Sequence, residues 1–126
     1  MPQAPVLGVP LMDRDHADIV GRFERMATCA DADLPAAFAE IEAEIRAHFA
    51  REEELFARHR VPIAHCHAEQ HALLLAAFET PRRAIASGDT PALRRFLLAD
   101  LPRAVAEHVD TVDRVTSGFL VGLADD

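Results

Sequence analysis

Two pairs of potential metal ligands occur at helical spacing in this 126-residue sequence. His48 and Glu52 are four residues apart, and so are His67 and His71. Residues four apart are neighbours on one face of a helix, so each pair can bind the same ion. Both pairs interrupt apolar stripes, at positions where hydrophobic side chains are expected. The spacing therefore predicts two chelating pairs that face a helical core.

Two more histidines, His16 and His108, fall on the apolar faces of other predicted helices. A polar group that is buried without a partner costs several kcal/mol, and a set of them would exceed the stability of a small domain. A metal site that binds all these side chains is the simplest way to compensate that cost.

Asp113 is harder to place on the same face. It follows His108 by five residues, which is about half a turn out of register on a regular helix. Either the two side chains reach the site from different sides, or the helix is locally distorted.

The types of ligand narrow the choice of metal. Several neutral imidazoles with one or two carboxylates, and without paired thiolates, suit iron, zinc, copper or manganese better than calcium or magnesium. Six or seven ligands are also too many for a single tetrahedral zinc ion. The sequence therefore predicts two metal ions.

The elements that position these ligands are predicted to be helices, because apolar residues recur every three or four positions and glycine is scarce. The first helix is expected to begin after Asp13 or Asp15. Its apolar face comprises Ile19, Val20, Phe23, Met26 and Ala27. The second is expected to begin near Pro35, with Asp33 as its cap.

The third helix is expected after the turn RHRVP and ends at Pro81 or at residues 87–89. The fourth begins at Thr90, and Pro102 is expected to kink or split it. Its predicted stripe comprises Leu93, Phe96, Leu97, Leu101, Val105, His108, Val112, Val115 and Phe119. Short loops between these helices predict an all-α, up-down-up-down four-helix bundle with a di-metal site in its core, formed by residues 1–126 as one domain.

The overall composition argues against several classes of partner. A net charge of −8 opposes a phosphate backbone, so no nucleic acid partner is expected. The sequence shows neither a secretory signal nor an apolar run that could cross a bilayer, which predicts a cytoplasmic protein without a membrane partner. In that reducing compartment Cys29 and Cys66 are expected to stay free, and both are interpreted as small buried hydrophobic residues.

The motifs HFAREE, HAEQH and HVDTVD, preceded by one histidine shortly after MD, resemble the hemerythrin family in its bacterial single-domain form. The family pattern is a histidine on the first helix, H-x3-E on the second, H-x3-H on the third and H-x4-D on the fourth. This sequence contains each element in that order, and the resemblance covers nearly the whole chain.

The resemblance implies two iron ions, Fe2+ or Fe3+, joined by an oxo or hydroxo bridge. The ligands that it implies are His67, His71 and His108 on one ion, His16 and His48 on the other, and Glu52 and Asp113 bridging both. One position stays open on the two-histidine ion, where hemerythrin-like proteins bind dioxygen reversibly. The implied function is oxygen carriage, storage or sensing without substrate turnover, either alone or with delivery to a separate partner protein.

Two other functions remain open at this point. The same di-iron centre serves as an enzyme on peroxide or nitric oxide in some relatives of the wider group. Alternatively, the bundle stores iron, or binds a metal whose role is only to stabilise the packing of its helices.

The residues expected around the metal site differ from those that are typical of hemerythrin-like proteins. The sequence has no tryptophan and no tyrosine, which hemerythrin-like proteins commonly carry near the metal-binding helices. Pro102 and Ala104 stand where a bulky ring is expected, which predicts a pocket more open to water. Candidates for its apolar lining are Ile19, Phe23, Phe49 and Val112.

Other polar residues near the motifs are interpreted as surface. His59 and His65 lie outside the spacing pattern and are expected in turns or exposed to solvent. Apart from Glu52, the run REEEL is expected to form a solvated face.

Overall fold

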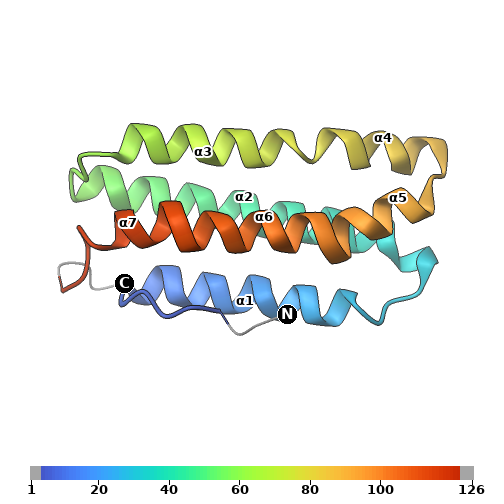
Figure 1. Cartoon of the computed structure of the whole chain (residues 1–126), viewed down its shortest axis with the longest axis horizontal. Coiled ribbons are helices and arrows are strands. Elements are labelled where there is room, and N and C mark those ends of the chain that lie inside the picture. The colour runs from blue at the N-terminus through green and yellow to red at the C-terminus, as the bar shows by residue number, and fades with distance from the viewer. Residues whose placement is uncertain (1–3, 123–126) are drawn as a thin grey trace.

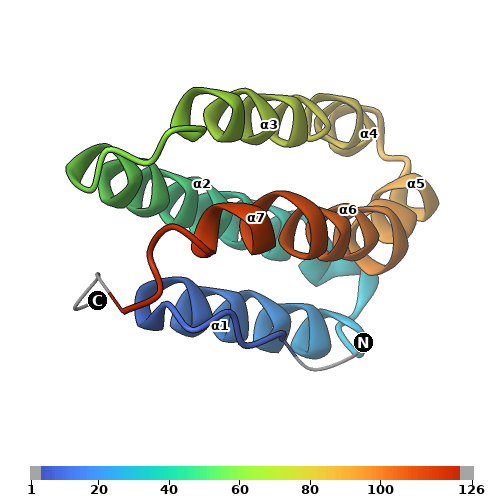
Figure 2. The same cartoon turned by 60° about the vertical axis from the view of Figure 1, so that its left-hand side comes forward.

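A computed structural model describes residues 4–122, which form four antiparallel helical arms (Figure 1). The helical elements are, in chain order, α1 (Pro10–Met26), η1 (Asp31–Asp33), α2 (Leu34–Arg58), α3 (Ala64–Ala76), α4 (Glu79–Ser87), α5 (Thr90–Arg95), η2 (Phe96–Asp100), α6 (Leu101–His108), η3 (Val109–Asp113) and α7 (Arg114–Ser117). Helices α3 and α4 run end to end as the third arm, and α5 to α7 form the fourth (Figure 2). Among the described residues there is no strand, and the predicted all-α four-helix bundle is confirmed.

Helix α1 begins earlier than the sequence suggests. Pro10 occupies its first turn, where a missing amide proton is tolerated. Asp13 does not cap the helix, because its carboxylate accepts hydrogen bonds from the amides of Leu7 (2.8 Å) and Gly8 (3.1 Å) in the segment before it. The expected start after Asp13 or Asp15 is therefore wrong.

The third helical arm continues beyond Pro81, the first of the two positions at which the sequence predicts that it ends. Pro81 lies in the first turns of α4, where it is tolerated, and the arm ends at Ser87. Gly88 then adopts a left-handed conformation with φ of 75°, which suits glycine after a helix. The arm that carries His67 and His71 thus spans most of the length of the bundle.

Two π turns interrupt the fourth arm. Turn η2 comes directly before the turn that contains Pro102, whose ring has no amide proton and excludes the regular bond to the carbonyl four residues earlier. The predicted distortion at Pro102 is confirmed. Turn η3 follows His108 and, as a π turn, contains one residue more than a regular α-helical turn.

The extra residue in η3 rotates the buried face of the arm. Beyond His108 the buried positions are Val109, Asp113, Thr116, Ser117 and Leu120. Val115 and Phe119, which belong to the predicted stripe, are 60% and 44% exposed. The predicted stripe is therefore wrong after His108, because it assumes a regular helix.

The core consists of two apolar clusters with a polar layer between them. One cluster extends from Ile19 and Phe49 to Leu101, and the other contains Met12, Leu55 and Leu120. On α1 the change from the second cluster to the first occurs across His16, and on α2 the reverse change occurs across Glu52. The polar side chains therefore lie inside the bundle with apolar packing on both sides.

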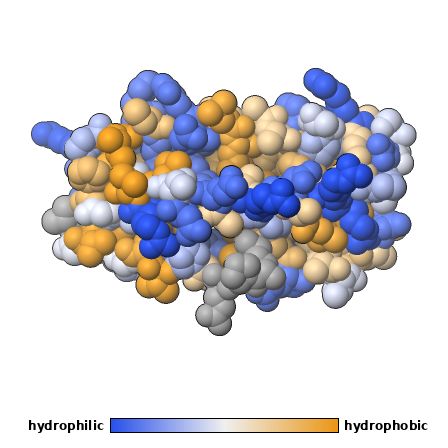
Figure 3. All heavy atoms as spheres, in the orientation of Figure 1, coloured by the Kyte–Doolittle hydropathy of each residue, from blue (hydrophilic) through white to orange (hydrophobic). Residues whose placement is uncertain are grey.

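The surface mixes hydrophilic and hydrophobic side chains on the face seen in Figure 3, where hydrophobic atoms gather toward the end that holds α7. The large apolar side chains that are exposed are Val6, Leu73, Val115, Phe119 and Val121. Within residues 4–122, no helix combines the length and the apolar character needed to cross a bilayer.

The two cysteines are free thiols, as predicted. Cys29 is half-buried, whereas Cys66 is exposed. The interpretation of Cys66 as a buried residue is wrong, because it precedes the buried His67 by one position and so points about 100° away around the helix.

Candidate metal centre

The structure brings all seven predicted ligand side chains together in the polar layer of the bundle. They come from every arm: His16 from α1, His48 and Glu52 from α2, His67 and His71 from α3, and His108 and Asp113 from the fourth arm. All seven are buried, and both carboxylates have no exposed surface. Each arm thus contributes at least one side chain to a single cluster.

The donor atoms of these side chains form two overlapping groups, each with all its atoms within 4.8 Å of one another. One group contains Glu52, His67, His71, His108 and Asp113, and the other contains His16, His48, Glu52 and Asp113. Glu52 and Asp113 belong to both groups. Because a carboxylate has two oxygens, each of these residues can bridge two ions.

The two oxygens of Glu52 face different imidazoles. Oε2 lies 3.0 Å from Nε2 of His48 and 3.6 Å from Nε2 of His16. Oε1 lies 3.1 Å from Nε2 of His71 and 3.3 Å from Nε2 of His67. The carboxylate therefore divides its oxygens between the two groups.

Asp113 divides its oxygens in the same way. Oδ2 lies 3.0 Å from Nε2 of His16, whereas Oδ1 lies 2.8 Å from Nε2 of His67 and 3.1 Å from Nε2 of His108. Turn η3 allows the contact between Asp113 and His108, because a π turn brings residues five apart onto one face of the helix. Of the two explanations left open by the spacing, local distortion of the helix is the correct one.

Ten atoms of this cluster have no hydrogen-bond partner although they are buried; one is Nδ1 of His16, and the other nine are the potential metal-binding atoms. They are the Nε2 atoms of His16, His48, His67, His71 and His108 and the four carboxylate oxygens of Glu52 and Asp113. The distances among them are short, but the groups are not oriented as hydrogen bonds. Leaving so many polar atoms unpaired in a core is very unfavourable. The donor set and its orientation fit metal ions placed between these atoms.

Comparisons with known proteins agree with this geometry. The family model described as Hemerythrin HHE cation binding domain matches residues 7–119. The chain belongs to the hemerythrin family. A bacteriohemerythrin from Ralstonia nicotianae is 34% identical over 114 residues, which are 90% of this chain and 82% of the relative. No solved structure matches the chain.

Membership of the hemerythrin family makes this a metal-binding protein, as the sequence predicts. The sequence did not predict the side chains that contact the outer nitrogen atoms of these histidines. Three of the imidazoles have their outer Nδ1 atom bound to another side chain, whereas Nδ1 of His16 is buried without a partner. These outer contacts decide which nitrogen of each ring carries the proton.

Thr116 fixes the protonation of His67 in the hemerythrin cluster. The threonine hydroxyl donates its proton to the carbonyl of Val112 (2.9 Å), so at His67 Nδ1 (2.8 Å) it can only accept. In the neutral ring, Nδ1 of His67 therefore carries the hydrogen, and Nε2, which faces the carboxylates, keeps the lone pair that a metal ion needs. No sequence pattern signals this contact, because the two residues are 49 positions apart.

Two carboxylates outside the cluster hold His48 and His71. Nδ1 of His48 donates to Oδ2 of Asp15 (2.9 Å), and Nδ1 of His71 donates to Oε2 of Glu53 (2.8 Å). Glu53 belongs to the run REEEL and is exposed, as expected of a solvated face, but it also accepts this hydrogen bond from His71. Both carboxylates are adjacent in sequence to a cluster residue, and that adjacency was the one available signal.

Without a metal, the electrostatics of the cluster favour the charged forms of its histidines and carboxylates. Burial lowers the pKa of His48 and His67, but interactions with Asp15 and Glu52 at His48, and with Asp113 and Glu52 at His67, outweigh it and raise each pKa to about 9. Burial raises the pKa of Glu52 and Asp113, but the surrounding histidines outweigh it and lower both pKa values. Metal ions therefore have to displace protons from this cluster.

Aromatic rings hold the histidines in place. Phe49 stacks on His71 with ring centroids 3.7 Å apart and an interplanar angle of 4°. Phe56 packs against His67 at 4.6 Å. Phe49 also contacts His48 and His108, so one phenylalanine supports three of the imidazoles.

A small cavity of about 10 Å³ adjoins the cluster, enough for roughly one water molecule. Its walls are His16, Ile19, Ile45, His48, Phe49, Leu74, Val105, His108, Val109 and Asp113. Ile19 and Phe49 line it as predicted, whereas Phe23 and Val112 do not. Val109 lines the cavity instead of Val112, which lines the larger groove.

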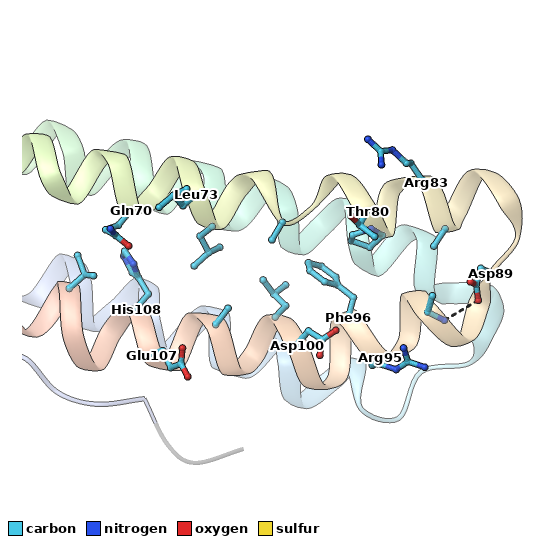
Figure 4. A pocket seen from close by; sticks show the side chains of 18 of the residues that line it. Gln70, Leu73, Thr80, Arg83, Asp89, Arg95, Phe96, Asp100, Glu107 and His108 are labelled. Carbon is cyan, nitrogen blue, oxygen red and sulfur yellow. Dashed lines mark hydrogen bonds between the residues drawn. The ribbon is translucent and has the colours of Figure 1, made fainter.

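A larger groove of about 930 Å³ lies between the α3–α4 arm and the fourth arm (Figure 4). Figure 4 shows His108 at one end of it, with its ring directed from α6 toward Gln70 and Leu73 on α3. Ala104 is part of the groove wall and Pro102 is not, and neither residue lines the small cavity beside His16 and His48, so the prediction that they open that pocket to water is wrong. His108 is also the most exposed of the seven, at 8%.

The histidines excluded from the site lie outside the cluster. His65 is exposed and pairs with Glu69 at 2.8 Å, and His59 follows the end of α2. The spacing pattern therefore separated cluster histidines from surface histidines correctly.

Proposed function

We propose that this hemerythrin-family chain, with residues 1–126 as one domain, holds two iron ions joined by an oxo or hydroxo bridge and binds dioxygen reversibly. The observation that carries the proposal is the division of the Glu52 and Asp113 oxygens between two groups of imidazoles. Two carboxylates used in this way suit a pair of adjacent ions rather than one.

The proposed ligands are His67, His71 and His108 on one iron, His16 and His48 on the other, and Glu52 and Asp113 between them. The nine unpartnered donor atoms and one bridging oxygen would leave a single position open on two six-coordinate ions. That position belongs to the two-histidine iron, which has fewer protein ligands. When bound, a pair of ferrous ions supplies the two electrons that reversible dioxygen binding requires.

The cavity supports a small, apolar ligand at this place. It adjoins His16 and His48, and Ile19, Ile45, Phe49 and Val109 contribute apolar walls. Such walls exclude water and mobile acids, which would otherwise shorten the lifetime of an oxygenated protein. The task of these residues is to keep the site dry and small.

The proposed role is carriage, storage or sensing of oxygen in the cytoplasm, where thiols such as Cys29 and Cys66 stay reduced. An enzyme that acts on peroxide or nitric oxide is the second candidate. The groove that ends at His108 is the observation for it, because it offers larger reactants an approach to the three-histidine group, whereas the small cavity adjoins the two-histidine group.

The test is to load the protein with ferrous iron without air, admit oxygen, and record the visible spectrum while the gas is removed again. An absorption band that appears with oxygen and disappears with its removal supports reversible binding. A one-way change to the ferric state supports the enzyme. Zinc in both sites of protein purified from its own cells would contradict both and indicate a structural metal.

A further inference from the structure

Asp15 binds two different side chains of α2 with the same carboxylate oxygen. Its Oδ2 accepts a hydrogen bond from Nδ1 of His48 at 2.9 Å and another from Nε of Arg51 at 2.8 Å. His48 and Arg51 are three residues apart, so they are neighbours on one face of α2. Asp15 itself precedes His16 on α1 and is 2% exposed.

This arrangement differs from the outer contacts of the other imidazoles. His67 donates to a neutral hydroxyl, and His71 donates to Glu53, whose side chain is 44% exposed and therefore screened by water. Among these three histidines, only His48 donates to a buried carboxylate. The same carboxylate is the only one of these partners that an arginine also binds.

We infer that Arg51 is a positioning residue that sets the redox balance of the two-histidine iron by sharing Asp15 with His48. A carboxylate that accepts from the outer nitrogen of an imidazole increases the electron donation of that ring to its metal and stabilises the ferric state. The Arg51 guanidinium draws charge from the same oxygen and so limits that donation. This inference rests on the iron centre of the proposed function.

The surroundings of Arg51 support a charge-balancing role. Asp15, Asp18 and Glu44 bring carboxylate oxygens within 4.8 Å of one another beside α1 and α2. A hydrogen bond to Asp15 raises the pKa of Arg51, and Glu44 and Asp18 add to that effect. The arginine side chain is 38% exposed, so it can be replaced without opening a cavity in the core.

The test compares Arg51→Gln and Asp15→Asn, which the inference expects to act in opposite directions. Both variants keep polar side chains at their positions, and the amide oxygen introduced by Asp15→Asn can still accept from His48. At a fixed applied potential, Arg51→Gln should lower the ferrous-to-ferric ratio about tenfold, and Asp15→Asn should raise it by a similar factor. Arg51→Lys, which restores the charge without the fork geometry, should fall between Arg51→Gln and the unmodified protein.

Arg46→Gln is the matched control, because Arg46 lies on α2, is exposed, and binds Glu42 away from the cluster. Zinc affinity, measured by competition with a chelator, gives a readout that is independent of redox chemistry. A structural role would weaken zinc binding in both test variants and shift both redox ratios the same way, which would overturn the inference. Arg51→Gln behaving like Arg46→Gln would also overturn it. Unmodified protein that holds no redox-active iron would instead overturn the proposed function and this inference together.

Discussion

Nε2 of His108 lies 3.1 Å from Oδ1 of Asp113 although five residues separate them on one helix. A regular α-helix would turn the two side chains well away from each other. Turn η3 supplies one additional residue at this point, so both side chains face the cluster. The same turn rotates every residue that follows, and this rotation can be tested through stability.

Leu120→Ala should lower the free energy of unfolding by about 2–4 kcal/mol, because Leu120 is 1% exposed after the rotation. Val115→Ala should change it by less than about 0.5 kcal/mol, since Val115 is 60% exposed. Urea denaturation followed by circular dichroism measures both. The reverse order of effects would indicate a regular helix through residues 109–113.

His71→Ala should reduce the bound metal by at least about tenfold and destabilise the bundle, because it removes a ligand and leaves a void against Phe49. His59→Ala should do neither, since His59 lies at the end of α2 and outside the cluster. Metal analysis of the purified variants tests this directly. Equal iron content in the two would refute the ligand assignment.

Thr116→Val should weaken metal binding about tenfold while the fold is retained, because Nδ1 of His67 loses the acceptor that fixes its orientation. Thr111→Val is the control on the same arm. The Thr111 hydroxyl also donates to a backbone carbonyl, that of Glu107, but it is exposed and away from the cluster. Chelator competition compares the two affinities, and indistinguishable values would show that Thr116 plays no part in metal binding.

Protein stripped of metal by a chelator should lose stability as the pH rises from about 6.5 to 9. His48 and His67 have pKa values raised to about 9, so their stabilising contribution is complete below the ordinary value of 6.5 and is lost as the pH passes 9. Glu52 and Asp113 have lowered pKa values, so their contribution is present above their ordinary values of 4.5 and 3.8 and is lost in acid.

The melting temperature of the stripped protein should therefore be highest in mildly acidic solution and fall on both sides. Calorimetry across the pH range measures it, with His65→Ala as a control that should follow the same profile because His65 is exposed. A flat melting temperature between about pH 6.5 and 9 would rule out the charged cluster.

Val109→Phe should fill the small cavity and slow or abolish the oxygen-dependent absorption band without removing iron, because Val109 lines the cavity. Val112→Phe should leave the band unchanged, since Val112 faces the groove and not the cavity. Stopped-flow mixing of the ferrous protein with oxygen compares the rates. Equal rates in both variants would place the oxygen site elsewhere.

Spacing along the sequence was enough to identify the cluster residues that share a regular helix turn. His48 with Glu52, and His67 with His71, follow directly from 3.6 residues per turn. The number of helices and the antiparallel bundle also followed from local periodicity and short loops. These features are local, so each can be read within one segment of the chain.

How the segments meet depends on packing between them. Residues 33 and 49 positions apart form the contacts Asp15 to His48 and His67 to Thr116, and no local pattern encodes them. The π turn at η3 likewise depends on packing, because the helix departs from regular hydrogen bonding to bury Asp113 beside His108. Local spacing thus establishes which side chains occupy each regular helical face. The packing of the four arms establishes which faces oppose one another, and by what rotation the last arm brings Asp113 into the site.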